Sequence, residues 1–407
     1  MRLACDDPRQ LKHAPTAAMI LGNLPSHRRY DAGMRILSVA ECLAGTTSRR
    51  RAVAARHNEP RVIGLLALAS IALATACAST SAQITPERRY YPINRPAPFV
   101  VVRPPEASGE LRIDLLKFGI AKPVASAAVE EGRVDLGTLF PMLWGAPSPE
   151  VLYAQLVVGD TPVGAPSVLQ PMVNPARAMV YDRGQGKPYY MDPLTKQASI
   201  DVRTADVIFQ PQTAAYSGIR AWTDQHVIFN TSLGEIEFRL RPDHAPNTVR
   251  NFLDLVEGGF YQDIIFHRIV PRLPSGAPFV LQVGDPTGSG DGGPGYAIDL
   301  EPSKLAHTFG VLSMARDNDP DTNGSQVFVA LSRQGTQFLD GKYTSFGEAV
   351  AGASVITDLE AVPVKGQTPV DPPILHSVRA RPAPPMGTGP EAVIRPSTTD
   401  TSVAPPR

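Results

Sequence analysis

Residues 266–285, FHRIVPRLPSGAPFVLQVGD, contain two short strand-like runs that are interrupted by prolines. The first run covers residues 266–270 and the second covers 279–283, and both are rich in β-branched and aromatic residues. The residues between them include three prolines, which lack the backbone N–H that a sheet ladder requires. The segment therefore predicts two short strands joined by a loop rather than one continuous strand.

Short strand-like runs of this kind extend through much of the chain. Between residues 99 and 212 they include FVVVRP, LRIDLLKFGI, VLYAQLVVGD and ADVIFQ, separated by Pro, Gly and Asp turn signals. The stretch contains no long run with helical period, so it predicts a separate β-rich domain whose role the residues do not indicate. The chain has 39 basic and 39 acidic residues, a balance that gives no sign of a nucleic-acid partner.

A second globular unit is expected to begin near Trp222, with the junction between the two units at 213–221. HVIFNTSLGEIEFRL, at 226–240, predicts two strands around a tight turn at Leu233–Gly234. APNTVRNFLDLVEGG, at 245–259, predicts a helix, because a proline is placed for its first turn, apolar residues recur at helical spacing and two glycines end it. Further short strands are expected to continue to about residue 378.

Residues 1–76 read as a basic leader followed by a signal segment. From Met1 to Leu66 eleven Arg and Lys stand against five Asp and Glu, and the apolar run VIGLLALASIALATAC at 62–77 follows. That run is shorter than the ~20 residues of a membrane-spanning helix but fits the core of a secretory signal. Small residues before Cys77 resemble a bacterial lipobox, which predicts a lipid anchor on Cys77 in the cell envelope, on its periplasmic or outer face. A plain signal peptide cut near Ala76 is the alternative.

The segments that flank the predicted domains are polar or proline-rich. Residues 77–98 are expected to be a tether and residues 381–407 a disordered tail with seven prolines. Secretory signals normally lie close to the initiator Met, so the first part of the leader, to about residue 52, is expected to come from an over-extended gene start. The three cysteines are Cys5, Cys42 and Cys77, so an exported part beyond Cys77 would hold no disulfide, cysteine nucleophile or zinc–thiolate site.

Two pattern matches are set aside. GSGDGG, at 288–293, fits a dinucleotide-binding glycine pattern, but PGY follows it instead of a helix. DPDTNG, at 319–324, resembles the opening of a calcium loop, yet Ala330 stands where the closing Glu would fall. We therefore expect no cofactor and no metal.

Five remaining motifs occur in a fixed order. They are FHR at 266–268, FVLQVGD at 279–285, LSMAR at 312–316, NGSQVFVAL at 323–331 and FLDGKYTSFGEAV at 338–350. This constellation resembles the cyclophilin family of peptidyl-prolyl isomerases over residues 222–380. The resemblance implies a mainly β fold, a closed eight-stranded antiparallel barrel with two capping helices, which carries a peptide groove on its outer face. It also implies that the partners are proline-containing polypeptides.

The resemblance assigns roles by motif position. Arg268 matches the catalytic arginine, and Gln282 matches the glutamine that would orient it. Many members of the family have a single Gly where this chain has RLPSGAP, so extra residues are expected to project beside the groove. The substrate-binding positions would be Phe279, Val280, Ala315, Arg316, Gln326, Phe328, Phe338, Leu339 and Tyr343.

Four of these positions depart from the better-known members of the family, among them Tyr343, which stands in place of a His. Val280 stands in place of a Met, Phe338 in place of a Trp and Arg316 in place of an Asn. The substitutions leave the expected activity in place but put cyclosporin sensitivity in doubt.

These residue types suit the reaction without the family name. Rotation about an Xaa–Pro bond needs no nucleophile, acid or metal, only an apolar pocket for the proline ring and a fixed cation that donates to the proline nitrogen as the bond twists. We predict a prolyl isomerase that assists the folding of exported proteins, with His267 as a structural, hydrogen-bonded residue. Two alternatives remain: a non-catalytic proline-peptide-binding module, and a protein whose functional part is the 99–212 domain.

Overall fold

The computed structural model describes residues 83–145, 150–174, 178–182, 187–189, 205–209 and 215–397. Cys77 and the predicted signal segment lie outside these residues. None of the helices in the described part is both long enough and apolar enough to cross a membrane.

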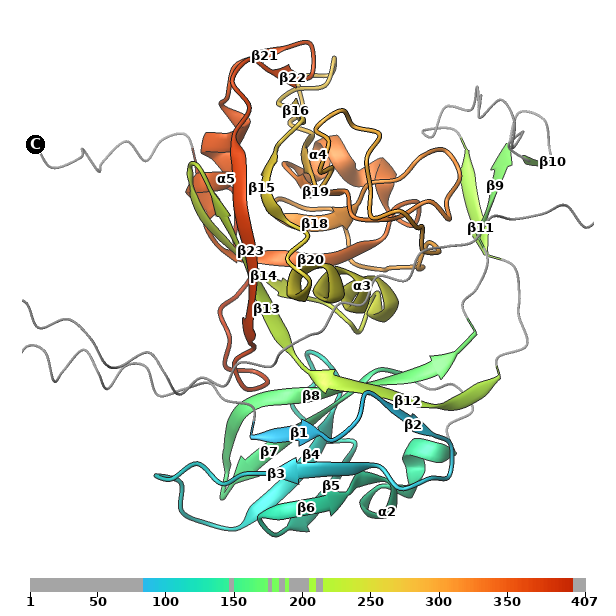
Figure 1. The fold of residues 1–407 in the computed structure, drawn as a ribbon, viewed down its shortest axis with the longest axis vertical. Helices are drawn as coiled ribbons and strands as arrows, with labels where there is room; N and C mark the ends of the chain where they lie inside the picture. The colour runs from blue at the N-terminus through green and yellow to red at the C-terminus, as the bar shows by residue number, and fades with distance from the viewer. Residues whose placement is uncertain are drawn as a thin grey trace, which may run out of the picture. The chain divides into compact units, whose positions relative to one another are not determined.

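The first part of the described chain consists almost wholly of β-strands (Figure 1). A six-stranded antiparallel sheet has the order β2-β12-β8-β7-β4-β5, and a three-stranded sheet has the order β1-β3-β6. The elements are β1 (Ile84–Pro86), β2 (Tyr90–Pro92), β3 (Pro98–Val101), β4 (Leu111–Leu116), β5 (Ala125–Val129), β6 (Gly132–Asp135), α2 (Leu136–Leu139), the 3-10 helix η1 (Pro141–Trp144), β7 (Leu152–Val158), β8 (Thr161–Val173) and β12 (Tyr216–Thr223). A further small sheet contains β9 (Ala178–Asp182), β10 (Lys187–Tyr189) and β11 (Asp206–Phe209).

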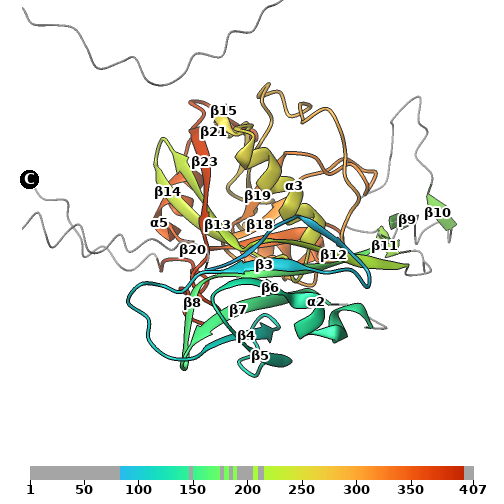
Figure 2. The same ribbon diagram turned by 60° about the horizontal axis from the view of Figure 1, so that its bottom comes forward.

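Every second side chain along a strand points into the core of this region. In β4 the side chains of Leu111, Ile113 and Leu115 enter one apolar cluster, which also contains Phe99 of the smaller sheet. The strands β4, β5, β7 and β8 lie side by side in Figure 2, as their pairing requires. Strands β1 and β2 belong to this fold, so the expectation of a tether over 77–98 is wrong for these residues.

The second part is built on a nine-stranded antiparallel sheet. Its order is β15-β23-β13-β14-β20-β18-β19-β17-β16, with a separate β21-β22 hairpin. The elements are β13 (Gln225–Thr231), β14 (Gly234–Leu240), α3 (Pro246–Glu257), β15 (Gln262–Ile265), β16 (Arg268–Val270), β17 (Val280–Val283), β18 (Val311–Met314), β19 (Val327–Ala330), α4 (Arg333–Thr336), the 3-10 helix η2 (Gln337–Leu339), β20 (Ser345–Ala351), α5 (Ala353–Glu360), β21 (Val364–Lys365), β22 (Thr368–Pro369) and β23 (Ile374–Pro382).

This sheet corrects the expected closed, eight-stranded barrel. It has nine strands, and no ladder joins its two outer strands, β15 and β16, among the described residues. The two outer strands are nevertheless consecutive in the chain, separated only by Phe266 and His267. One chain segment therefore pairs with β23 through its first half and with β17 through its second half.

The predicted hairpin and helix are both present. Gly234, at φ 129°, makes the turn between β13 and β14, a backbone conformation that favours glycine. In α3 the side chains of Val249, Phe252 and Leu253 are buried in the core of the sheet. The free N–H groups at the start of α3 are met by the carboxylate of Glu301, which accepts from Thr248 N at 2.6 Å and Asn247 N at 3.0 Å.

Residues 383–397 pack against the fold instead of forming the expected disordered tail. The backbone N of Met386 donates to Gln155 Oε1 in β7 at 2.9 Å, and the N of Val393 donates to the carbonyl of Ala349 in β20 at 2.8 Å. Arg395 is paired with Glu360 of α5 at 2.6 Å. Proline-rich composition removes backbone donors, but the backbone N–H groups of Met386 and Val393 still find partners on folded elements.

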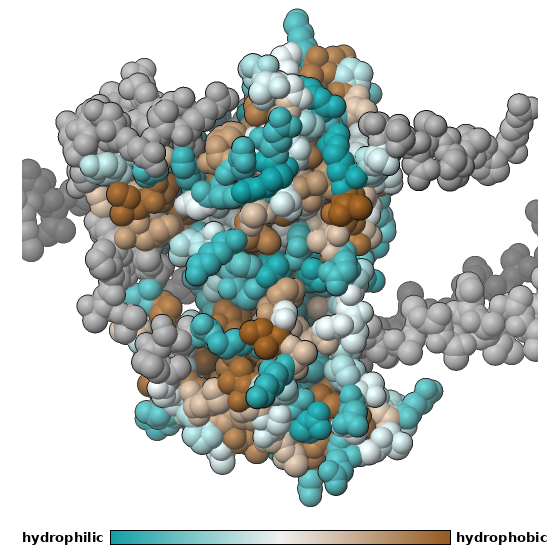
Figure 3. Space-filling view, turned by 180° about the vertical axis from the view of Figure 1, so that it is seen from behind, coloured by the Kyte–Doolittle hydropathy of each residue, from teal (hydrophilic) through white to brown (hydrophobic). Residues whose placement is uncertain are grey.

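The six-stranded and nine-stranded sheets are in direct contact. Tyr153 of β7 and Trp222 of β12 belong to the same buried apolar cluster as the core of the nine-stranded sheet. The expected junction at 213–221 overlaps β12, so the chain passes from one sheet to the other at Asp224. On the face drawn in Figure 3, hydrophilic residues surround small apolar areas, in keeping with most large apolar side chains being inside.

Candidate active site

Strand register brings the predicted catalytic residues together. Arg268 of β16 is paired with Gln282 of β17, and Gln282 is paired with Phe328 of β19. Paired residues on neighbouring strands point to the same face of a sheet, so all three side chains share one surface. The proline-rich loop ends one strand and starts the next without disturbing this register. The interruption therefore lets one stretch of chain supply two paired strands, with Arg268 on one and Gln282 on the other.

Two glutamines hold the guanidinium of Arg268 from two sides. Nη1 donates to Gln282 Oε1 at 3.0 Å, and Nε donates to Gln367 Oε1 at 2.6 Å. In the part of the chain that the structure describes, Nη2 makes no hydrogen bond, and the Arg268 side chain lines the groove. Burial lowers the pKa of Arg268, but an arginine side chain remains charged at neutral pH.

The hydrogen-bond chain continues beyond Gln282. Its Nε2 donates to Gln326 Oε1 at 2.8 Å, and Gln326 Nε2 donates to the carbonyls of Gly290 and Gly292 at 2.7 and 2.9 Å. Asp285 shapes that glycine loop. Burial alone would raise the pKa of its carboxyl group, but hydrogen bonds from the loop lower it to about 2. The orientation of Gln282 is therefore fixed by a series of contacts that ends in a folded loop.

An apolar pocket lies beside this polar row. Val280, Phe328 and Leu339 are almost fully buried and form one cluster with Val270. The groove over them has a volume of about 700 Å³. It is lined by every predicted site residue except Gln326, namely Arg268, Phe279, Val280, Gln282, Ala315, Arg316, Phe328, Phe338, Leu339 and Tyr343.

Aromatic rings and one arginine form the rim. Phe279 stacks on Phe338 with ring centroids 5.7 Å apart, and Tyr343 meets Phe328 edge-on at 5.9 Å. The guanidinium of Arg316 lies 4.5 Å from the centroid of the Tyr343 ring. Its N–H groups donate to backbone carbonyls, including that of Lys342 at 2.8 Å. Arg316 is therefore held in place as part of the wall.

The sequence did not indicate two neighbours of the site, Gln367 and His307. Gln367 lies between β21 and β22, far along the chain, and nothing in its local pattern pointed to Arg268. His307 stacks beneath Phe328 at 5.8 Å and contacts Asp340 at 2.9 Å. His267, which belongs to the FHR motif, also lines the groove, and burial lowers the pKa of its imidazole.

Comparisons with known proteins find relatives of the second part of the chain. The family model "Cyclophilin type peptidyl-prolyl cis-trans isomerase/CLD" matches residues 226–380. Peptidyl-prolyl cis-trans isomerase-like 1 of Aspergillus fumigatus is 43% identical over 152 residues, covering 36% of this chain and 88% of that protein. Peptidyl-prolyl cis-trans isomerase ppi1 of Schizosaccharomyces pombe is 47% identical over 135 residues, covering 32% of this chain and 81% of that protein.

A solved structure also matches this part of the chain. It is a Cryptosporidium parvum cyclophilin type peptidyl-prolyl cis-trans isomerase in the presence of the dipeptide Ala-Pro. It is 34% identical and covers 38% of this chain and 96% of its own, with a TM-score of 0.35.

The chain belongs to the cyclophilin-type peptidyl-prolyl cis-trans isomerase family. The assignment rests on the two sequence relatives, which are matched over most of their length. Its activity is accordingly the cis–trans isomerisation of Xaa–Pro peptide bonds.

Proposed function

We propose that the groove between Arg268 and the Val280, Phe328 and Leu339 pocket is the site at which this chain isomerises proline peptides. The observation that carries the proposal is the guanidinium of Arg268, which is fixed by two neutral amides directly beside a buried apolar pocket. The proline ring would occupy the pocket and its nitrogen would face the arginine.

The chemistry of the bond explains this arrangement. Rotation about an Xaa–Pro bond crosses a barrier of about 18–20 kcal/mol, because amide resonance is lost when the bond twists. The proline nitrogen then gains a lone pair, which accepts a hydrogen bond from Arg268 only in the twisted state. A contact that is stronger in the transition state than in the planar state lowers the barrier.

The neighbouring residues position the two reacting parts. Gln282 and Gln367 hold the plane of the guanidinium, so its donors need not reorient as the bond twists. Gln326 lines a neighbouring hollow and accepts from Gln282, so it would fix the orientation of Gln282 from behind the groove. The rim of Phe279, Phe338 and Tyr343 would exclude water from the proline ring.

Exchange NMR on a short Xaa–Pro peptide tests the site. Wild-type protein should accelerate cis–trans exchange of the peptide, and the chemical shifts that move on titration should belong to residues of the groove. Protein that binds the peptide without accelerating its exchange would contradict the catalytic role of the groove. A proline-binding module would then be the better description.

We further propose that the substrates are exported proteins and that Cys77 carries lipid. The support is the apolar run at 62–77 with small residues before Cys77, and the basic stretch that precedes it. One acyl chain alone binds membranes weakly, so stable attachment would need more than one. Mass spectrometry of the mature protein and membrane fractionation of Cys77→Ser test this. A Cys77→Ser protein that stays wholly with membranes, or a mature start elsewhere, would overturn it.

A further inference from the structure

The loop that separates β16 from β17 is a compact element. Leu273 N donates to the carbonyl of Ala277 at 2.8 Å, and Gly276 N donates to the carbonyl of Leu273 at 2.8 Å. Gly276 has φ 82°, which allows the tight return of the chain. Leu273 packs against the apolar cluster under the groove, so the loop is attached by a side chain as well as by its ends.

The far end of the loop is fitted closely to α4. The hydroxyl of Ser332 donates to the carbonyl of Pro278 at 2.7 Å. A Cβ added at Gly335 would lie 1.9 Å from that same carbonyl oxygen, so only glycine fits there. On the other side, Leu331 N donates to the carbonyl of Phe279 at 2.8 Å. The loop is therefore held rigidly beside the groove.

A second hollow lies between the loop and α4, with a volume of about 220 Å³. It is smaller than the roughly 300–1,000 Å³ of pockets that enclose a whole small molecule, and its size suits a single side chain. Phe338 lines both this hollow and the groove, and the next residue, Leu339, belongs to the proline pocket. The lining residues are Leu273, Pro274, Ser275, Gln334, Gly335 and Phe338.

The charges beside the hollow are already paired. Arg272, next to Leu273 in the chain, forms an ion pair with Glu360. Arg333, next to Gln334, forms an ion pair with Asp340. Neither cation is left to attract an acidic side chain, while Leu273 and Phe338 offer apolar surface. An uncharged, apolar occupant fits this surface better than a charged one.

We propose that this hollow is an additional substrate subsite, which receives an apolar side chain of the residue next to the substrate proline. The inference rests on the proposed function of the groove. The proposal depends on Phe338, which lines both the groove and the hollow. A peptide whose proline ring lies on Leu339 places its neighbouring residue within one residue length of Phe338. The extra residues of the loop thus select substrates by what flanks the proline.

Isomerisation kinetics with the full chain test the subsite. Two pairs of proline peptides are compared, which carry leucine or alanine directly before or directly after the proline. Wild-type protein should show a kcat/KM about tenfold higher for leucine than for alanine at one of the two positions, near the low end of what a small apolar pocket discriminates. Leu273→Ala should bring that ratio close to one. Leu233→Ala, on the turn between β13 and β14, is the matched control and should keep the ratio.

The outcomes separate the subsite from the site itself. Wild-type protein that isomerises none of the peptides contradicts the proposed function. Wild-type protein that isomerises all four without a leucine preference, or a preference that survives Leu273→Ala, overturns the subsite alone. Should Leu273→Ala fail to fold, titration of wild-type protein with the leucine peptide gives the same decision. The amide signals of Ser275 and Gly335 must then shift more than with the alanine peptide.

Discussion

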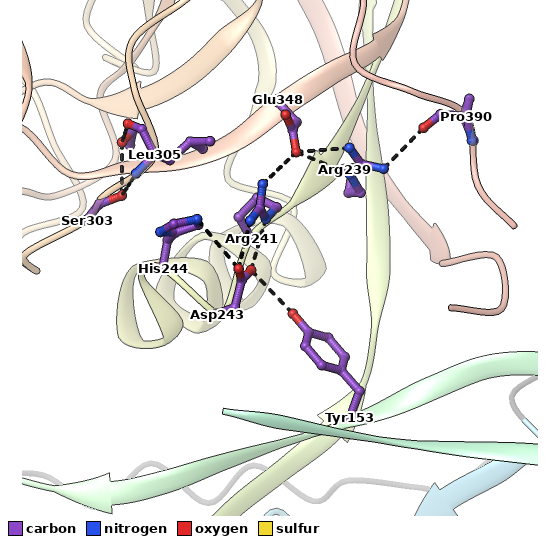
Figure 4. A network of polar contacts seen from close by, with 10 residues as sticks. Tyr153, Arg239, Arg241, Asp243, His244, Ser303, Leu305, Glu348 and Pro390 are labelled. Atoms are coloured by element: carbon purple, nitrogen blue, oxygen red, sulfur yellow. Dashed lines mark hydrogen bonds and ion pairs between the residues drawn. The ribbon is translucent and has the colours of Figure 1, made fainter. Parts of the chain in front are cut away.

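Arg268 in the groove and Arg241 between the two sheets are both held in a fixed plane, but by different kinds of partner. Arg241 donates from Nε and Nη2 to Asp243 at 3.0 and 2.7 Å, and from Nη1 to Glu348 at 2.9 Å (Figure 4). Its guanidinium also lies 3.9 Å from the ring centroid of Phe118, which follows β4 of the six-stranded sheet. Arg268 instead contacts the neutral amides of Gln282 and Gln367.

The difference in partners changes what each charge can do. Burial by itself lowers the pKa of Arg241, but hydrogen bonds and charge from Asp243 and Glu348 raise it above its ordinary value. The charge of Arg241 is thereby neutralised by its two carboxylate partners, and the ion pairs hold these segments of the fold together. At Arg268 burial lowers the pKa, and no carboxylate among the described residues is paired with its guanidinium. Amide partners fix the orientation of a cation while leaving its charge available to a substrate.

The largest expected effect is on Arg268→Ala. Removal of one preorganised donor typically costs about 3–4 kcal/mol in the barrier, so the isomerisation rate constant should fall roughly a hundred- to a thousand-fold. Arg268→Lys should restore little, because an ammonium group cannot occupy the planar site between two glutamine oxygens. Exchange NMR gives the rate, and circular dichroism checks the fold. If Arg268→Ala turned over nearly as fast as wild type, Arg268 would not be catalytic and would not differ in role from Arg241.

Arg241→Ala should show the opposite behaviour. It removes the arginine partner of Asp243 in a mostly buried place, while Glu348 keeps its ion pair with Arg239, and should lower the free energy of unfolding by about 3 kcal/mol. The isomerisation rate should stay within about twofold of wild type, because Arg241 does not line the groove. Denaturant titration measures the stability. Arg379→Ala is the matched control, since Arg379 and Glu235 are both 52% exposed and such a pair contributes about 0–1 kcal/mol.

Asp224 offers a third case, because it is a buried carboxyl group that, within the described part of the chain, accepts from a backbone N–H and not from an arginine. Burial chiefly, with the nearby charge of Asp243, raises its pKa to about 7. A carboxyl whose pKa is raised in the folded state favours folding below its unfolded pKa and loses that contribution as the pH rises through 7. Stability should therefore fall on the order of 2 kcal/mol between pH 5 and pH 8.

Asp224→Asn tests this pH dependence. The variant should show a flatter dependence of the unfolding free energy over the same range, measured by denaturant titration at several pH values. Asp371→Asn, at an exposed position, serves as the control and should retain the wild-type dependence. An unchanged dependence in Asp224→Asn would place the titrating group elsewhere.

The smallest expected effect concerns Gln367. Gln367→Ala removes one of the two partners of Arg268 and should lower the rate about tenfold, since a hydrogen bond to a charged group contributes at least about 1.5 kcal/mol. Gln367→Glu keeps the size but supplies a carboxylate like those around Arg241. If neutral partners matter, Gln367→Glu should be slower than Gln367→Ala. A Glu variant as active as wild type would show that the charge of the partner is irrelevant.

Local pattern predicted much of the fold and of the groove. The hairpin around Gly234, the helix that begins at Pro246 and the split at 271–278 all follow from residue type and period, and all are present. The site residues were assigned by a resemblance that depends on short motifs, and strand register brings them together as the motifs imply.

What the sequence missed depends on contacts between distant segments. Gln367 reaches Arg268 from a hairpin about a hundred residues away, and no periodicity encodes such a meeting. The segment after Pro382 was predicted to be disordered from its prolines, yet Met386 and Arg395 find partners on folded elements. The nine-stranded order, in which the described residues of the outer strands β15 and β16 do not pair with each other, likewise follows from long-range pairing and not from any local signal.

The chain passes between the six-stranded and nine-stranded sheets more than once. It crosses at Asp224, and it returns after β23, where Met386 reaches Gln155. The two crossings are tied to each other, because Ala383 N donates to the carbonyl of Asp224 at 2.9 Å. A body attached by one strand can swivel about it, whereas two joined attachments remove that rotational freedom. A pull on either sheet is therefore shared between two paths, which the hydrogen bond between Ala383 and Asp224 joins.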